Sequence, residues 1–366
     1  MDIYAEINGI KYNIKNASDL KEINFYNFDI NTIPSYCLIN NNKGTYFAIS
    51  KWVSPKRTRS YPFERVYNTL SVSKRVTVIP IIKDEGLEGD RDFIQWDTVS
   101  LMSLLNVYVI FAYYSKAEKH RTRENKITKQ QFDNKYIISK IEEMNNYHSS
   151  ALHWNLKEIK NTLPNLIERV KKSYTEIGNQ LGVKFHNISG IERFKNQFET
   201  GVKKFMQISR QKAQEAQHRE KQTIQPKESL TTATKATITI INYLGGLYYF
   251  TTDEVAIQNN TLLLIESKHS KSFKLASLGD IKDGLLKMIL YCNFENVRIG
   301  NNKYKTKPVL KLTSTKLKAR LSSNDGIDES TIFFNKNSLD IKQKELIKKL
   351  FAEGRENNFI ISIEEV

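Results

Sequence analysis

Three charged residues in the last third of the chain stand out because they occur inside apolar, strand-like segments. Asp253 begins one such segment, and Glu266 and Lys268 end a second one, LLLIESK at 262–268. The polar sequence QNNT at 258–261 predicts a tight turn, so the two segments should form a β-hairpin. This turn brings position 253 roughly opposite position 266, and the two-residue period of a strand places Glu266 and Lys268 on one face. Two carboxylates and an ammonium group are therefore expected to converge at one end of the hairpin.

This grouping has a definite chemistry. Charged side chains are rarely buried unless they are paired or bind a metal, and two close carboxylates repel each other unless a cation lies between them. Mg²⁺ binds carboxylate oxygens together with waters and phosphate oxygens, and a metal-bound water is a nucleophile for a phosphodiester. Lys268 would orient that nucleophile or neutralise the developing charge. The simpler alternative is a surface hairpin in which Glu266 and Lys268 form a solvated pair.

The pattern Asp253…Glu266-Ser267-Lys268, followed by an amphipathic helix after Ser277, resembles the PD-(D/E)XK nuclease superfamily, and the chain as a whole is similar to a type II restriction endonuclease. The resemblance implies that Asp253, Glu266 and Lys268 are catalytic. It also implies that Asp253, Glu266 and the main-chain carbonyl of Ser267 bind Mg²⁺. Hydrolysis would leave a 5′-phosphate.

The resemblance covers about 228–312 and departs from the pattern at Thr252, where the superfamily often has proline. Glu254 is an adjacent competitor for the role of Asp253, but strand alternation should turn its side chain to the opposite face. Such nucleases often carry a further glutamate on a helix before the hairpin, and Glu228 is the nearby candidate. Glu228 and Glu254 are therefore possible accessory acids.

The charge balance indicates a polyanionic partner. The chain has 56 Lys+Arg and 40 Asp+Glu, a formal net charge of +16, which favours nucleic acid or an anionic membrane surface. Together with the resemblance, this predicts double-stranded DNA. Basic residues alternate with aromatics at 51–65, a pattern that suits phosphate contacts, although a solvated basic loop is an equal alternative. The candidate DNA-binding residues are Lys51, Lys56, Arg57, Arg59, Arg65 and, after the hairpin, Lys271.

Other function classes find no support in the sequence. No stretch of about 18 apolar residues predicts a membrane-spanning helix, and the first residues lack the pattern of a signal peptide. Cys37 and Cys292 fit neither a disulfide framework nor a zinc spacing, and no Walker-type phosphate loop is present. We therefore expect a cytoplasmic protein with no membrane partner.

The coarse organisation predicts an α/β chain (α+β, with a mixed sheet) that has a restriction-endonuclease-like core, an N-terminal α/β region and a long helical middle segment. The basic stretch 116–130 interrupts the pattern as a linker, a solvated helix or a DNA-contacting loop. The expected domains are an N-terminal region for DNA recognition (1–130), a helical segment for dimerisation or DNA contact (131–226) and a catalytic domain (227–366).

An acid-rich stretch at 84–97 competes with the hairpin as a functional site. It could form a metal-binding loop, or part of a second nuclease-like core that ends in the strand at 107–114. The alternative is a structural loop in which Asp92 or Asp97 lies near the start of a helix, where the helix dipole favours an acid.

The sequence as a whole predicts a Mg²⁺-dependent type II restriction endonuclease that cuts double-stranded DNA at a specific site. A palindromic site would require a homodimer, and a cognate DNA methyltransferase is expected to be encoded with it. Two alternatives remain open. One is another nuclease of the same superfamily, acting in repair or in a mobile element, and the other is a DNA-binding protein without catalytic activity.

Overall fold

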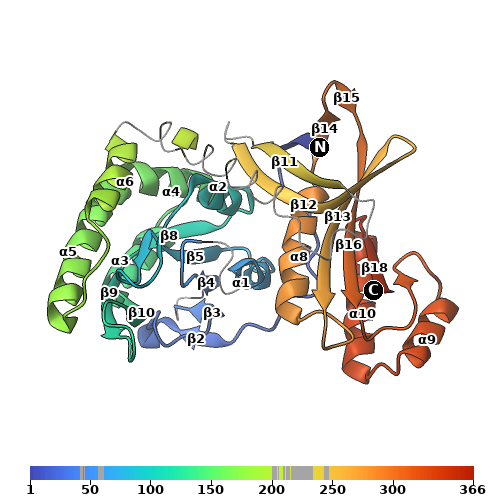
Figure 1. Ribbon diagram of the computed structural model, residues 1–366, viewed down its shortest axis with the longest axis horizontal. Helices are drawn as coiled ribbons and strands as arrows, with labels where there is room; N and C mark the ends of the chain where they lie inside the picture. Colours follow the sequence, from blue (N-terminus) through green and yellow to red (C-terminus); the bar gives the residue numbers. More distant parts are fainter. Residues whose placement is uncertain are drawn as a thin grey trace. The chain divides into compact units, whose positions relative to one another are not determined.

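The computed structural model describes residues 1–41, 44, 46–56, 62–199, 204, 206–208, 211, 215, 234–242 and 247–366. Its α/β composition with mixed sheets confirms the predicted fold class. The chain divides into two compact units (Figure 1), and each is described by itself. The split unit comprises Met1–Ser18 and Lys212–Val366, and the continuous unit comprises Asp19–Gln211. The division differs from the three predicted segments, because the N-terminal residues join the sheet of the last segment and the helices pack with the α/β region.

The continuous unit is built around a five-stranded sheet in the order β2-β3-β4-β5-β8. The strands are β2 (Glu22–Asn24), β3 (Tyr36–Asn40), β4 (Tyr46–Lys51), β5 (Arg75–Pro80) and β8 (Tyr108–Ala112). Helices α1 (Pro62–Thr69) and α2 (Trp96–Leu104) connect β4, β5 and β8, which run parallel. Parallel neighbours need such crossovers. The sequence predicts strands at 44–53, 75–82 and 107–114 and helices at 61–70 and 96–105, and the described residues of these segments confirm them.

Short strands and helices surround this sheet. They are η1 (Phe25–Asn27), β6 (Ile82–Asp84), β7 (Arg91–Phe93), β9 (Tyr114–Lys119), β10 (Ile127–Phe132), α3 (Asn134–Asn145), α4 (Ala151–Lys157), the π-helical turn η2 (Glu158–Thr162), α5 (Leu163–Leu181) and α6 (Ser189–Glu199). Apolar side chains of α3 and α4, among them Ile141 and Trp154, pack into one core with those of the sheet. Pro164 lies at the start of α5, where a proline is tolerated.

The basic stretch 116–130 contributes the end of one strand, the start of another and the loop between them, which corrects the prediction of a linker or solvated helix and leaves the loop alternative for 120–126. Strands β9 and β10 pair as an antiparallel hairpin, and only the residues between them form a loop. The strands were missed because apolar residues occur only at the ends of the hairpin, where Tyr114 stacks on Phe132 with ring centroids 4.4 Å apart.

The split unit contains a nine-stranded mixed sheet in the order β15-β14-β1-β11-β12-β13-β16-β18-β17. The strands are β1 (Asp2–Ile7), β11 (Thr234–Asn242), β12 (Leu247–Gln258), β13 (Thr261–Ser270), β14 (Glu295–Ile299), β15 (Asn302–Lys303), β16 (Lys305–Ser314), β17 (Leu321–Ser322) and β18 (Ile360–Glu365). Strands β11, β12 and β13 form an antiparallel meander, and β13, β16 and β18 run parallel. The composition of 229–244 favours a strand and its length favours a helix; β11 shows that the described part is a strand.

The helices with described bounds in the split unit are α8 (Leu278–Tyr291), α9 (Ile327–Lys336) and α10 (Ile341–Glu356). Helix α8 lies against β13 and β16 (Figure 1). It approaches closely, since a Cβ atom at Gly284 would lie 2.7 Å from Cδ1 of Leu310. Ser277 caps its first turn by accepting a hydrogen bond from the amide of Asp280. This confirms the amphipathic helix predicted at 277–292. No helix in the described part of the chain is long and apolar enough to cross a membrane.

Candidate functional site

The hairpin predicted from the sequence is present with the predicted register. Strands β12 and β13 pair from Glu254 with Ile265 to Gln258 with Thr261, which leaves Asn259 and Asn260 as a two-residue turn. Both asparagines have positive φ angles, 44° and 61°. Asparagine tolerates this left-handed conformation better than most residues, and turns of this kind match the twist of the paired strands. The turn therefore brings Asp253 to the level of Glu266, as the residue spacing requires.

The Asp253 carboxylate faces the strand that carries the other candidate residues. Its Oδ2 accepts a hydrogen bond from the main-chain N–H of Ser267 at 2.9 Å. Strand β12 has a register irregularity against β11 close to this point, between the pairs of Thr234 and Ala236. Bulges of this type re-aim side chains near functional sites.

Glu266 and Lys268 lie on one face of β13, beneath helix α8, as predicted. The Lys268 ammonium lies 3.0 Å from Oε1 of Glu266. Two residues of α8 complete the group: Lys287 lies 2.7 Å from Oε2 of Glu266, and Asp283 lies 2.9 Å from the Lys268 ammonium. Glu266 is 1 % exposed, so both oxygens of a buried carboxylate are paired with ammonium groups.

The pKa values of these groups follow from burial and charge. Burial raises the pKa of Glu266, but the charges and hydrogen bonds of Lys287 and Lys268 outweigh it, so its pKa lies below the ordinary value. Burial lowers the pKa of Lys268, but Glu266 and Asp283 outweigh it, and the result is a raised pKa. The pKa of Lys287 is raised for the same reason, mainly by Glu266 and Asp253. All three side chains are therefore charged at neutral pH.

Asp253 differs from the other carboxylates of the site. Burial and the neighbouring charge of Glu266 raise its pKa, and the charges of Lys287 and Lys268 offset this only in part. Three acids and two lysines meet here, which leaves one surplus negative charge when all five groups are ionised. Among the described residues, the hydrogen bond from Ser267 is the one that the Asp253 side chain receives. Asp253 is thus the acid of the group that forms no ion pair with a lysine of the described residues, and its pKa is raised.

Sequence reasoning missed Asp283 and Lys287. They are four residues apart in α8, so they share one helix face, and Tyr291 follows after another four. The detectable signal was this polar pair in a helix that otherwise buries Ile281, Leu285 and Ile289. Spacing alone does not tell which strand such a pair faces, because that depends on how α8 packs against the sheet.

The donor set suits the magnesium ion that the resemblance implies. Asp253 and Glu266 would supply two carboxylates, and Ser267, the residue after Glu266, would supply its main-chain carbonyl oxygen. The net negative charge of the group favours binding of a cation. Coordination through Glu266 would require its oxygens to be shared with an ammonium group. The described residues contain no ready-made cluster of three or more His, Cys, Asp or Glu side chains for a metal.

Glu254 lies on the opposite face of the sheet, as strand alternation predicts. Its carboxylate lies 3.4 Å from the Lys311 ammonium, which also lies 3.7 Å from Glu364. Glu228, the other possible accessory acid, lies outside the described residues. His269, next to Lys268, hydrogen-bonds through Nδ1 to the Thr313 hydroxyl.

The candidate DNA-binding residues have varied environments. The Lys51 ammonium donates to the carbonyl oxygens of Ile30 and Ile33, and Arg65 donates to the carbonyl oxygen of Lys51, so both make internal contacts. Lys56 is more exposed and lies 4.0 Å from Asp92. Lys271 is exposed beyond the end of β13. Arg57 and Arg59 fall outside the described residues.

The acids of the stretch 84–97 are held by internal partners. Buried Asp84 pairs with Nδ1 of His186 at 2.8 Å, and Asp92 accepts a hydrogen bond from the Ser54 hydroxyl. Asp97 lies in the first turn of α2. These contacts are those of the structural alternative, in which an acid stands near the start of a helix.

Comparison with known proteins adds nothing to this site. No protein-family model matches the chain, and no curated protein or solved structure matches it.

Proposed function

We propose that this protein is a magnesium-dependent endonuclease of the type II restriction kind, which hydrolyses phosphodiester bonds of double-stranded DNA at a specific sequence. The observation that supports the proposal best is the grouping of Asp253, Glu266 and Lys268 on adjacent strands beneath α8. The order of β12, β13, α8 and β16, with β16 parallel to β13, also suits the superfamily that the motif resembles.

Each residue has a role in this proposal. Asp253, Glu266 and the Ser267 carbonyl would hold the magnesium ion. The ion, when bound, lowers the pKa of a coordinated water and neutralises charge on the phosphate. Glu266 and Asp283 raise the pKa of Lys268 and so favour its protonated form. In that form it would neutralise charge on a phosphate oxygen.

The positioning of this lysine comes from the helix. Asp283 holds the Lys268 ammonium on one side and Glu266 holds it on the other. Charge-assisted hydrogen bonds of this kind are short and directional. The two acids thereby limit the positions that the ammonium can take at the site.

The partners follow from the same proposal. The net charge of +16 favours a DNA duplex, whose binding would weaken steeply with salt. Exposed lysines such as Lys56 and Lys271 suit phosphate contacts. We also propose a homodimer on a palindromic site, a cytoplasmic location and a cognate DNA methyltransferase.

The test is cleavage of unmethylated phage DNA in the presence of Mg²⁺, with discrete fragments as the expected product. Asp253→Asn, Glu266→Gln and Lys268→Ala should each abolish cleavage and retain DNA binding in a gel-shift assay. Glu254→Gln is the matched control, because Glu254 neighbours Asp253 and faces the other side of the sheet. It should cleave normally.

The outcomes separate the alternatives. If the wild type binds DNA without cutting it, the protein is a non-catalytic DNA-binding protein. If the three variants still cut with Mg²⁺, the site is wrongly assigned. Non-specific degradation instead of discrete fragments would favour another nuclease of the same superfamily over a restriction enzyme.

A further inference from the structure

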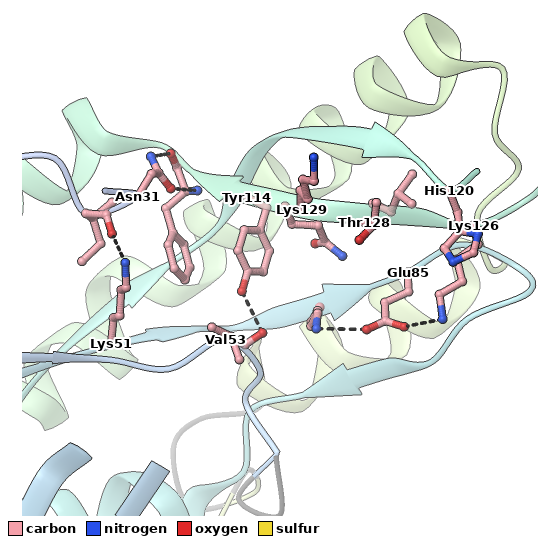
Figure 2. A pocket seen from close by; sticks show the side chains of 14 residues that line it. Asn31, Lys51, Val53, Glu85, Tyr114, His120, Lys126, Thr128 and Lys129 are labelled. Atoms are coloured by element: carbon pink, nitrogen blue, oxygen red, sulfur yellow. Dashed lines mark hydrogen bonds and ion pairs between the residues drawn. The ribbon is translucent and has the colours of Figure 1, made fainter. Parts of the chain in front are cut away.

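The continuous unit contains a pocket of about 480 Å³ that the hydrolytic site does not use. Figure 2 shows it between the β9–β10 hairpin, which contributes Tyr114 and Thr128, and the segments that carry Lys51, Val53 and Glu85. Pockets for small ligands and cofactors have volumes of about 300–1,000 Å³. The space is therefore of the right size for a small organic molecule.

The pocket is lined by more cationic than anionic groups. Its charged lining residues are Lys51, Lys83, Lys126, Lys129 and a single acid, Glu85. Glu85 lies 2.9 Å from the Lys83 ammonium and 3.2 Å from that of Lys126 (Figure 2), so one carboxylate is shared by two lysines. Among the described residues, two ammonium groups thus share one carboxylate, an excess of one positive charge in this trio.

Lys51 adds a second positive charge on another side of the pocket. Its ammonium donates to two main-chain carbonyl oxygens, each at 2.7 Å, and these carry no net charge. Among the described residues no carboxylate lies within ion-pair distance of it. The interior therefore favours an anion and disfavours a metal cation.

The other lining residues are partly polar (Asn31, His120, Thr128 and Gln130) and partly apolar and aromatic. Tyr114 stacks on Phe132 with an angle of 20° between the rings, and Ile30, Val53 and Ile127 extend this surface. The Tyr114 hydroxyl is bonded to the carbonyl oxygen of Val53. A ligand with both an anionic group and a flat apolar group would match the two kinds of wall.

The backbone at the rim of the pocket is also unusual. Strand β10 shifts register against β9 between Thr128 and Gln131, and Lys129 within this bulge has a φ of 48°. A lysine in this left-handed region is strained, and such bulges occur preferentially beside functional sites.

We infer that this pocket binds a nucleoside phosphate, with the phosphate near Lys83 and Lys126 and the base against the aromatic wall. The phosphate could belong to a free nucleotide or to the 5′-phosphorylated end of a DNA strand, since both present the same group. The inference does not depend on the proposed hydrolase activity.

Isothermal titration calorimetry of the full chain, without divalent metal, tests this. Thymidine 5′-monophosphate should bind, and thymidine should bind at least about tenfold more weakly because it lacks the charge-assisted hydrogen bonds. A short 5′-phosphorylated oligonucleotide that outcompetes its 5′-hydroxyl form identifies a DNA end as the source. Preference for the mononucleotide identifies a free nucleotide.

Two variants should shift the affinity in opposite directions. Lys126→Gln should weaken binding of the monophosphate about tenfold, and Glu85→Gln should strengthen it, because each changes the pocket charge by one unit in opposite senses. Lys172→Gln, at an exposed position of α5 in the same unit, should have no effect. If Lys126→Gln proves unstable in a thermal melt, the affinity of Glu85→Gln for the monophosphate still tests the inference. Absence of binding, equal binding of thymidine, or no gain of affinity in Glu85→Gln would overturn the inference.

Discussion

The ammonium group of Lys287 lies 2.7 Å from Oε2 of Glu266, which joins helix α8 to strand β13 inside the protein. The Glu266 side chain is 2 % exposed, and the Lys287 side chain is 19 % exposed. Removing one partner of such a buried pair leaves an uncompensated charge. The pair therefore contributes both to the packing of α8 and to the electrostatics of the candidate site.

The first prediction concerns this pair. Lys287→Met should destabilise the protein by about 3 kcal/mol, because Glu266 would keep only Lys268 as a cationic partner. It should also reduce Mg²⁺-dependent DNA cleavage at least tenfold. Urea unfolding and a plasmid cleavage assay measure the two effects. Lys287→Arg retains the positive charge, so it should keep a large part of the stability and of the cleavage activity. Equal losses in Lys287→Met and Lys287→Arg would show that the shape of the side chain, and not its charge, matters at this position.

A second prediction concerns Glu353, a buried acid of α10 that joins the N-terminal segment of the split unit to this helix. Its carboxylate accepts hydrogen bonds from the Tyr12 hydroxyl, the Lys15 amide and both the main-chain and side-chain nitrogens of Asn16. Glu353→Ala should cost about 3 kcal/mol, because these buried donors lose their acceptor.

Glu356→Ala is the matched control for this prediction. Glu356 lies one turn further along α10 and pairs with Lys15, but both side chains are about 40 % exposed (43 % and 39 %). Exposed pairs contribute less than about 1 kcal/mol. Similar losses in Glu353→Ala and Glu356→Ala, measured by urea unfolding, would contradict the assigned role of Glu353.

A third prediction concerns Gly86, in the turn between β6 and β7. Its φ is 91°, and a Cβ atom there would lie 2.3 Å from the main-chain oxygen of Asn125. Gly86→Ala should destabilise by about 3 kcal/mol through strain and this clash. Gly182 also has a positive φ, 60°, but has open space around it, so Gly182→Ala should cost only about 1 kcal/mol. Thermal unfolding of the two variants measures this difference. Equal losses of stability would mean that the structure around position 86 relaxes and removes the clash.

The fourth prediction is a pH dependence at Glu85. Burial raises the pKa of this carboxyl, but the hydrogen bonds and charges of Lys83 and Lys126 outweigh burial, so the pKa lies below its ordinary 4.5. An acid with a lowered pKa in the folded state contributes stability above its unfolded-state pKa. That contribution is lost as the pH falls through the folded-state pKa.

Urea unfolding between pH 7 and pH 3 measures this effect. The wild type should be more stable than Glu85→Gln at neutral pH, and the difference should shrink below about pH 4.5. A difference that stays constant over this range would show that Glu85 does not stabilise the fold through its charge.

The hairpin that carries the candidate site could be predicted from the sequence because its signals are local. The two apolar runs on either side of the turn, the asparagines at the turn and the two-residue period of a strand determine register and facing. The helical spacing of Ile281, Leu285 and Ile289 likewise predicted α8. Each signal lies within about twenty residues, so it needs no knowledge of the rest of the fold.

Only the tertiary structure decided which distant segments complete these elements. Strand β1 pairs with β11, more than two hundred residues away, and Asp283 and Lys287 reach Lys268 and Glu266 only because α8 packs against β13. Such contacts depend on which apolar faces pack against each other, and the local spacing of apolar residues in the sequence does not specify this. The sequence by itself determined the acids, the lysine and their common face, whereas the packing of α8 determined which charges surround them.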